Sequence, residues 1–202
     1  MIMAYDWDEH YKRGGVSGDP ADYAEGRAWK MDIIKRYCNL DSEWVLDFGC
    51  GDLQFWDGNL PKNYIGLDIS CDIIRKNQVK YPLPLFICAN AATPTTMKVD
   101  IVLCFDVLWH IINDKDYECI LKNIANNAGK TAIIFTWSAN PADEDIVTYL
   151  TSALCDLKRG GYQKYRGFLS IATPIFSDFD LVEVAQNPVW KFGSMYVFRR
   201  KG

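Results

Sequence analysis

The chain has 202 residues, of which 49% are hydrophobic and 24% charged, the usual composition of one folded globular domain. This balance excludes a disordered or collagen-like chain. Lys and Arg number 22 against 26 Asp and Glu, so the net charge is −4, and the only basic run is 199–201. A nucleic-acid partner normally requires a basic patch, so the charge weighs against one. No apolar stretch approaches the ~18 residues of a membrane span, and the acidic first ten residues do not resemble a signal peptide. We therefore expect a cytoplasmic protein that does not bind membranes.

The cysteines do not form a recognisable framework. There are seven of them with only two histidines, and no two cysteines have CxxC spacing. Most lie in apolar runs, where a thiol packs as a small hydrophobic group. We therefore predict a reduced protein with neither a structural disulfide nor a bound metal.

Short apolar runs alternate with segments of helical periodicity. In chain order, the patterns predict a helix at 22–38, strands at 44–48 and 64–69, a helix at 70–79, strands at 83–88 and 100–105, a helix at 113–126, and strands at 131–137, 180–185 and 194–199. Ser70 and either Asn113 or Asp114 are expected N-caps, and Gly129 is expected to end the third helix.

Continuous apolar runs are typical of strands that are buried on both faces of a parallel sheet. The last two strands are separated by only a short segment, which indicates that one of them is antiparallel. The sequence therefore predicts an α/β fold: a Rossmann-like, doubly wound, mostly parallel seven-stranded sheet with one antiparallel strand at the C-terminal end.

The motif with the clearest chemistry follows the first predicted strand. Asp47 ends that strand, and Gly49 and Gly51 follow it. Glycine permits a sharp turn and lets a ligand approach bare backbone. The second strand ends at Asp68, 17 residues beyond Gly51, near the spacing expected for a carboxylate that binds a ribose diol. Together these residues predict a nucleoside site at the carboxyl edge of the sheet.

These residues resemble the class I S-adenosylmethionine-dependent methyltransferases. Their acid-and-glycine motif matches 47–51, their second-strand acid matches Asp68, and their strand-four end matches FDVLWH at 105–110. The resemblance covers about residues 40–137 and implies S-adenosyl-L-methionine as cofactor. The positions it assigns to cofactor binding are Asp47, Gly49, Cys50, Gly51, Asp68, Ile69, Asn90, Ala91 and Phe105. Cys50 is interpreted as a small packing residue, and Leu53 stands where the family often has a third glycine.

The N-terminal sequence WDEHYKRGGVSG at 7–18 is similar to the opening of some small bacterial and viral methyltransferases of this class. That similarity implies a lid built on Gly14, Gly15, Ser17 and Gly18, in which Tyr11, Gly15 and Ser17 contact the cofactor. Trp7 and Tyr11 are four residues apart and would share one helical face. The alternative is a tail with an incidental turn.

Two residues at the end of the fourth strand are candidates for catalysis. His110 is a candidate general base because imidazole titrates near neutral pH. Asp106 occupies a position that contacts substrate near the methyl group in the resembling family. The alternative is that His110 only lines the site.

The resemblance implies methyl transfer to a small-molecule O or N acceptor. The alternatives are a non-catalytic adenosylmethionine-binding or partner-binding subunit of the same fold, or a protein or nucleic-acid methyltransferase. The oligomeric state stays open. We divide the single domain 1–202 into a lid and helix at 1–39, a cofactor-binding core at 40–137, an insertion at 138–178 on the acceptor side with a helix at about 143–158, and a C-terminal hairpin at 179–202.

Overall fold

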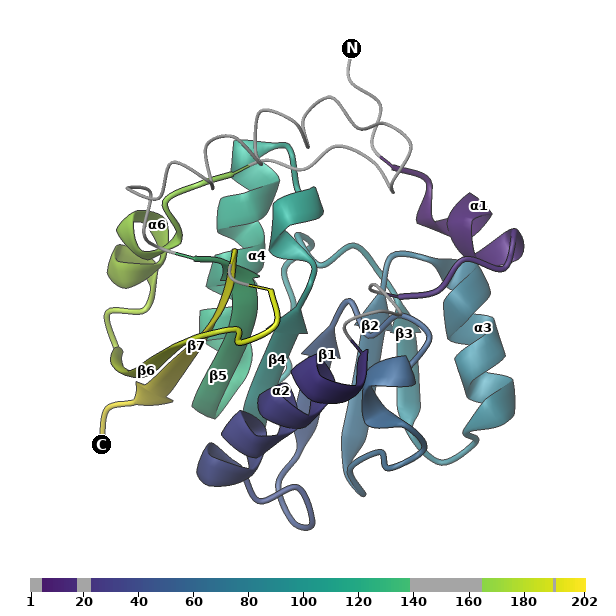
Figure 1. Cartoon of the computed structure of the whole chain (residues 1–202), viewed down its shortest axis with the longest axis horizontal. Coiled ribbons are helices and arrows are strands. Elements are labelled where there is room, and N and C mark those ends of the chain that lie inside the picture. Colours follow the sequence, from purple (N-terminus) through teal and green to yellow (C-terminus); the bar gives the residue numbers. More distant parts are fainter. Residues whose placement is uncertain (1–4, 18–22, 139–164, 191) are drawn as a thin grey trace.

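The computed structural model describes residues 5–17, 23–138, 165–190 and 192–202. In these ranges seven strands form one sheet, with α3 near one end and α6 near the other (Figure 1). The elements are α1 (Trp7–Lys12), α2 (Tyr23–Tyr37), β1 (Val45–Phe48), η2 (Gln54–Trp56), β2 (Tyr64–Asp68), α3 (Cys71–Lys80), β3 (Leu85–Cys88), β4 (Val99–Phe105), η3 (Leu108–His110), α4 (Asp114–Asn127), β5 (Ala128–Trp137), α6 (Phe168–Ile175), β6 (Phe179–Gln186) and β7 (Gly193–Arg200). Within the described residues, no helix is long and apolar enough to span a bilayer.

The strand order is β3-β2-β1-β4-β5-β7-β6. Strands β1 to β5 pair in parallel, and β7 runs antiparallel to both of its neighbours, β5 and β6. The predicted fold is therefore confirmed, including the single antiparallel strand. Each predicted strand is present, with its ends shifted by at most three residues. Because the order reverses between β1 and β4, ligands of such sheets bind above the carboxyl ends of these two strands.

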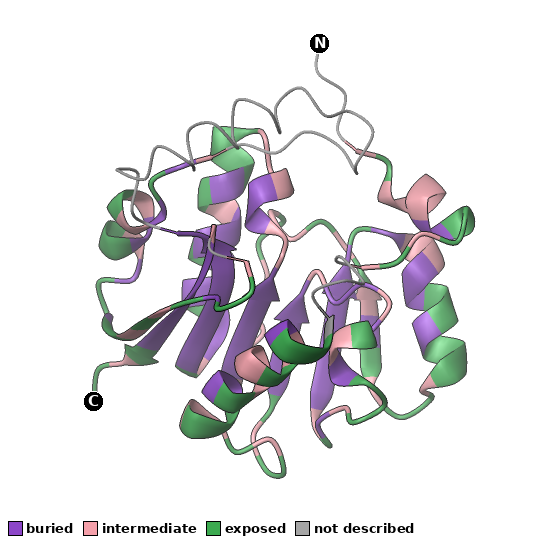
Figure 2. Ribbon diagram, viewed as in Figure 1, coloured by how far each residue is buried: buried purple, intermediate pink, exposed green. Residues whose placement is uncertain are grey.

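The central strands of the sheet are buried on both faces, as the continuous apolar runs indicate, whereas the edge strands β3 and β6 are partly exposed. Along β4, Val102 and Cys104 belong to the core beneath α4 and α6, whereas Ile101 and Leu103 belong to the core beneath α2. This alternation follows from the two-residue period of a strand. Figure 2 shows β1, β4 and β5 buried along nearly their whole length. A rigid central sheet therefore supports the loops at its carboxyl edge.

The helix predicted at 113–126 is present as α4, with Asn113 as its N-cap, but the prediction that Gly129 ends it was wrong. The helix ends at Asn127 and Gly129 lies inside β5. A side chain on Gly129 would lie 2.8 Å from the carbonyl oxygen of Val99, so glycine is needed where β4 and β5 approach closely. The helix predicted at about 143–158 lies outside the described residues, as does Gly18.

The prediction of no structural disulfide was also wrong, because Cys71 and Cys88 are bonded. Cys88 is the register partner of Asp68 in the β2–β3 pair, and Cys71 begins α3 three residues after Asp68. This arrangement brings the two Cα atoms within 5.1 Å. The pairing depends on strand register, so the cysteine spacing carried no signal of it. Cys38, Cys50, Cys104 and Cys119 have free thiols.

Candidate functional site

The loop after β1 is shaped by two glycines in the left-handed region. Gly49 has φ +76° and Gly51 has φ +53°. A side chain on Gly49 would overlap the side chain of Val107, which follows β4, and one on Gly51 would overlap the hydroxyl of Ser17. Glycine is therefore required at both positions for conformation and for space. The loop is enclosed by the segment after β4 on one side and the N-terminal segment on the other.

Leu53 also lies in the left-handed region, with φ 64°. Its side chain is only 3% exposed and packs into the core with Trp56 and Ile74. The Leu53 side chain therefore points into the core, and it does not occupy the loop surface that a third glycine would leave open. The chain continues as the short 3₁₀ helix η2 in place of an α-helix.

Asp68 lies at the carboxyl end of β2 with its carboxylate held by backbone donors. The N–H of Gly51 donates to one oxygen at 3.0 Å, and the N–H of Ser70 donates to the other at 2.9 Å. Burial raises the pKa of Asp68 above its ordinary value, and these two hydrogen bonds offset part of that rise. A carboxylate offers about four lone-pair sites, so roughly two remain for a ligand. Asn77 of α3 donates to the carbonyl oxygen of Gly51 at 2.7 Å and fixes the same loop.

Asp47 faces the interior and not the loop surface. One of its oxygens accepts hydrogen bonds from the hydroxyl of Tyr64 at 2.7 Å and from the indole N–H of Trp56 at 3.2 Å. Burial raises the pKa of Asp47 to about 6, and the carboxylates of Asp68 and Asp106 add to that rise. In this structure Asp47 therefore anchors β1 to β2 and η2.

The ends of β2 and β3 present open groups beside Asp68. Ile69, which follows β2, is 54% exposed. Asn90 is exposed, and its side-chain oxygen accepts from the N–H of Ala92 at 2.9 Å, which shapes the turn. The carbonyl oxygen of Ala91 accepts from Asn123 of α4 at 2.7 Å. An accessible apolar and amide surface therefore lies next to the buried carboxylate.

At the end of β4, Asp106 adopts φ 62°, rare for a residue other than glycine. Lys30 of α2 forms an ion pair with its carboxylate at 2.7 Å. The ammonium group of Lys30 also lies 3.8 Å from the ring centre of Phe135 and 5.6 Å from that of Phe105. Lys30 therefore ties α2 to the carboxyl ends of β4 and β5 through an ion pair and cation–π contacts.

His110 ends the 3₁₀ helix η3 that follows β4. Its Nδ1 atom is buried and has no hydrogen-bond partner among the described residues. Its ring lies 5.1 Å from the ring of Trp7 of α1 and 6.2 Å from that of Trp109, centre to centre. Burial lowers the pKa of His110 to about 4. The imidazole is therefore neutral at pH 7, with one buried nitrogen uncommitted.

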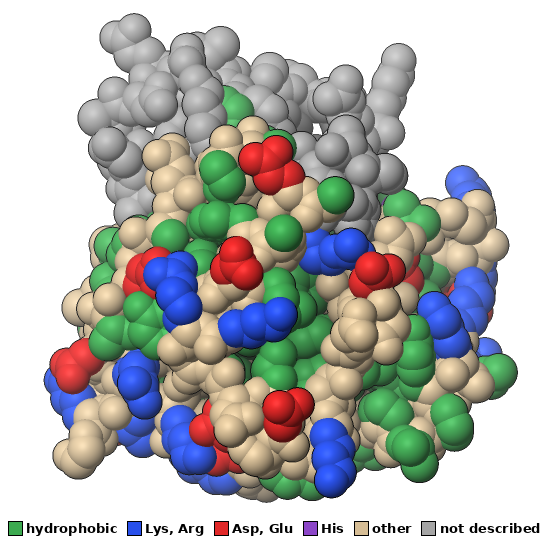
Figure 3. Space-filling view, turned by 60° about the horizontal axis from the view of Figure 1, so that its bottom comes forward, with side chains coloured by type: hydrophobic (Ala, Val, Ile, Leu, Met, Phe, Trp, Pro, Cys, Tyr) green, Lys and Arg blue, Asp and Glu red, His purple; other side chains and the backbone are tan. Residues whose placement is uncertain are grey.

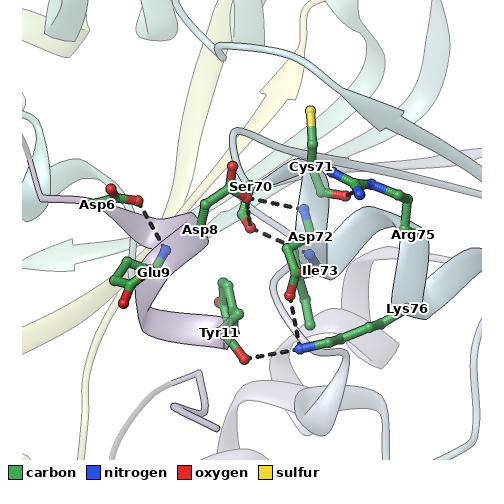
Figure 4. A network of polar contacts seen from close by, with 10 residues as sticks. All are labelled: Asp6, Asp8, Glu9, Tyr11, Ser70, Cys71, Asp72, Ile73, Arg75 and Lys76. Atoms are coloured by element: carbon green, nitrogen blue, oxygen red, sulfur yellow. Dashed lines mark hydrogen bonds and ion pairs between the residues drawn. The ribbon is translucent and has the colours of Figure 1, made fainter. Parts of the chain in front are cut away.

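The N-terminal helix α1 contacts the first turn of α3 (Figure 4). Asp8 accepts a hydrogen bond from the hydroxyl of Ser70 at 2.6 Å and another from the N–H of Asp72 at 3.0 Å. Lys76 donates to the carbonyl oxygen of Tyr11 at 2.9 Å. Ser70 also caps α3, as predicted, by accepting from the N–H of Ile73. We refer to the bonds of Asp8 to Ser70 and Asp72 as the Asp8 contact.

After α1, the chain passes over the glycine loop. The hydroxyls of Tyr11 and Ser17 are 2.8 Å apart, and Ser17 exchanges two hydrogen bonds of 3.1 Å with Asp52. Gly15 packs directly on the ring of His10, where a side chain would not fit. Burial raises the pKa of the Tyr11 hydroxyl, and the nearby carboxylate of Asp68 adds to the rise. Tyr11, Ser17, Gly51 and Asp68 are thus brought together.

Most of the predicted site residues gather at this edge, but some serve the framework. Cys50 is buried, and burial raises the pKa of its thiol well above the ordinary value, so it is a packing residue in this structure. Phe105 is 9% exposed and packs its ring against Phe55. Sequence reasoning missed Lys30 and Asp8, because each acts on a residue far away in the chain and follows no local motif.

Comparison with known proteins identifies the core of the chain. Residues 46–133 match the family described as the methyltransferase domain. An uncharacterized protein of Methanocaldococcus jannaschii is 33% identical over 104 residues, and that match covers 50% of this chain. It covers 44% of that protein, so the match spans less than half of this curated relative.

Solved methyltransferases share the whole fold at low identity. Magnesium protoporphyrin IX methyltransferase of Synechocystis PCC 6803, with bound SAH, has a TM-score of 0.63 at 18% identity, covering 96% of this chain and 93% of its own. The N-methyltransferase NodS of Bradyrhizobium japonicum WM9, in complex with S-adenosyl-L-homocysteine, has a TM-score of 0.67 at 13% identity, covering 96% and 98%. An S-adenosylmethionine-dependent methyltransferase of Anabaena variabilis has a TM-score of 0.70 at 13% identity, covering 99% and 98%.

These structural likenesses establish the fold, and the domain match falls on the segment that contains the glycine loop, Asp68 and Asp106. Residues 46–133 therefore match the methyltransferase domain, and the chain as a whole has the fold of these solved S-adenosylmethionine-dependent methyltransferases.

Proposed function

We propose that this protein transfers a methyl group from S-adenosyl-L-methionine to an oxygen or nitrogen atom of a small molecule. The observation that carries the proposal is Asp68. Its carboxylate is oriented by the N–H groups of Gly51 and Ser70 and retains acceptor sites at the carboxyl edge of the sheet. Two adjacent ribose hydroxyls match such an acceptor.

The residues present fit the rest of the cofactor. Ile69 and Asn90 offer an exposed apolar and amide surface beside Asp68, suited to an adenine ring. Asp106 adds a half-exposed carboxylate at the next strand end, and Asp52 lies at the glycine loop. Negative charge at this edge favours the positive sulfonium and amino groups of the cofactor. When bound, the cofactor supplies an activated methyl group.

The chain's contribution to the reaction is alignment and, for a hydroxyl acceptor, removal of a proton. Holding two reactants in line lowers the barrier by about 7–11 kcal/mol at best. His110 is neutral at pH 7 because burial lowers its pKa to about 4, so its free nitrogen accepts a proton. A pKa this low makes His110 a weak base. A weak base suits a reaction in which the acceptor hydroxyl loses its proton late in the methyl transfer. Asp106, held by Lys30, orients the acceptor.

The N-terminal segment 5–17 acts as a lid in this proposal. Trp7 lies against His110, and Tyr11 and Ser17 lie on Gly51, so one segment reaches both the acceptor side and the cofactor side. The Asp8 contact holds it on α3. Residues 40–137 bind the cofactor, and 138–178 select the acceptor.

The acceptor is a small molecule, and nucleic acid is disfavoured as partner. On the face shown in Figure 3, Lys and Arg side chains are interspersed with Asp and Glu and form no continuous basic patch. The net charge of −4 agrees with this. A cytoplasmic location stays a prediction from the sequence.

Titration calorimetry with S-adenosylhomocysteine tests the proposal. We expect binding to the wild-type protein and at least about tenfold weaker binding to Asp68→Ala, because a hydrogen bond to a charged group contributes about 1.5–3 kcal/mol. Asp68→Asn keeps an acceptor without the charge and should fall between the two. Asp180→Ala, which removes an exposed carboxylate on β6, is the matched control.

Turnover is measured as release of S-adenosylhomocysteine with a panel of small hydroxyl and amine acceptors. Binding without turnover on any acceptor would favour the non-catalytic alternative. Wild-type affinity in Asp68→Ala would show that Asp68 does not bind the ribose.

A further inference from the structure

The Cys71–Cys88 disulfide joins the two segments that border the proposed cofactor site. Cys71 begins α3, two residues after Ile69, and Cys88 ends β3, two residues before Asn90. A backbone hydrogen bond of 2.9 Å from Ala89 to the carbonyl oxygen of Asp68 joins the same two strand ends. The bridge therefore adds a covalent link beside the hydrogen bonds that already join β2 and β3 at this edge.

The first turn of α3 connects this bridge to the rest of the site. Ser70, adjacent to Cys71, donates its N–H to Asp68 and its hydroxyl to Asp8. Further along the same helix, Asn77 holds the carbonyl oxygen of Gly51. A shift of α3 would therefore move the ribose-binding carboxylate, the glycine loop and the lid contact together.

The described cysteines differ in accessibility. Cys88 is exposed, and Cys71 is half-buried, as are the free thiols of Cys38 and Cys119. Cys50 and Cys104 are buried, and burial raises the pKa of both thiols, so they react slowly with soluble oxidants. Oxidation should therefore fall on the pair whose Cα atoms already lie within bonding range.

We propose that Cys71 and Cys88 form a reversible thiol–disulfide pair whose oxidation raises the affinity of the site for the adenosyl cofactor. The inference rests on the proposed function. The bridged form holds Ile69 and Asn90 in register before the cofactor arrives. The reduced form must order both segments on binding, which lowers affinity.

A low-molecular-weight disulfide, such as oxidised glutathione, serves as oxidant. The thiolate of one cysteine attacks a glutathione sulfur, breaks the glutathione disulfide and releases one glutathione thiolate. The thiolate of the second cysteine then attacks the protein sulfur of the mixed disulfide and releases the second glutathione thiolate. The two thiol protons pass to the two glutathione products, and two electrons pass from the cysteines to the oxidant.

The test uses the full chain equilibrated either with oxidised glutathione or with dithiothreitol. Alkylation of free thiols followed by peptide mass spectrometry reports the bridge, and calorimetry reports S-adenosylhomocysteine affinity. We expect the Cys71–Cys88 bridge in the oxidised sample, with affinity about three- to tenfold higher than in the reduced one, the effect of ordering one or two fewer groups on binding. Cys71→Ser and Cys88→Ser should bind as the reduced protein does under both conditions.

Cys119→Ser, which removes a free thiol on α4, should keep the redox response. Failure to detect the bridge in the oxidised chain would overturn the proposal, as would equal affinity of the bridged and reduced forms. Either result leaves the proposed function standing. Absence of binding in both forms would instead overturn the proposed function and this inference with it.

Discussion

Replacing Asp8 by Ala should release the N-terminal segment from α3 without unfolding the domain. The substitution removes one carboxylate oxygen that accepts from Ser70 at 2.6 Å and from Asp72 at 3.0 Å. Hydrogen bonds to charged groups contribute about 1.5–3 kcal/mol each when buried. Asp8 is only half-buried, so solvent screening reduces the combined contribution to about 1–2 kcal/mol. The equilibrium constant for docking of the segment should therefore fall by a factor of about 5–30.

Limited trypsin digestion measures this opening, because Lys12 and Arg13 are exposed cleavage sites within the segment. Cleavage there should accelerate in Asp8→Ala, and S-adenosylhomocysteine affinity should fall. Glu9→Ala is the matched control: it removes a carboxylate from the same helix whose ion pair, within the described part of the chain, is with Arg13. Equal cleavage rates in the two variants would refute the role of Asp8.

The Asp8 contact also has a defined dependence on pH. The hydroxyl of Ser70 and the N–H of Asp72 lower the pKa of Asp8 below its ordinary 3.8. A carboxyl group whose pKa is lowered by folding stabilises the folded state above its unfolded pKa, and that stability is lost as the pH falls through the folded pKa. The segment should therefore stay docked at pH 5, and trypsin-independent probes such as hydrogen exchange should detect release only below about pH 4.

Three further predictions concern stability. Burial lowers the pKa of His110 to about 4, so the folded state loses stability as pH falls from 6.5 to 4. The raised pKa of Asp47 changes stability in the opposite direction over the same range. Comparing urea unfolding of His110→Phe with that of the wild type across this range should therefore isolate a His110 contribution of up to about 3 kcal/mol. An identical pH profile would contradict this. Lys30→Met should lower the free energy of unfolding by about 1–2 kcal/mol through loss of the ion pair and the cation–π contacts, and an unchanged urea midpoint would argue against both. Gly49→Ala should cost at least about 2 kcal/mol because of its positive φ and its overlap with Val107, and Val107→Ala should rescue part of that loss; strictly additive losses would rule out the overlap.

The sheet could be predicted from the sequence because strand burial leaves a local signature. The central strands are continuous apolar runs, β6 mixes apolar and acidic residues, and the short link before β7 marked the antiparallel end. Asp68 and the glycine loop could be predicted because their chemistry requires fixed residue types at strand ends. Gly129 was misread as a helix stop because glycine serves two purposes: a helix end uses its left-handed conformation, whereas the close approach of β4 and β5 requires its lack of a side chain.

Contacts between distant segments left no such signature. The Lys30–Asp106 ion pair joins residues 76 positions apart, and the Cys71–Cys88 bridge depends on the β2–β3 register. Asp47 was expected at the cofactor, yet its carboxylate is turned toward Tyr64 and Trp56. Which way a side chain at a strand end points is decided by its neighbours across the sheet, and a single sequence does not contain that information.

A crystal structure of the full chain with S-adenosylhomocysteine would locate the cofactor directly. We predict ribose hydroxyls within hydrogen-bond distance of the Asp68 carboxylate, with the adenine between Ile69 and Asn90 and the sulfur facing Asp106 and His110. A ligand bound elsewhere, or a ribose that does not contact Asp68, would contradict this prediction.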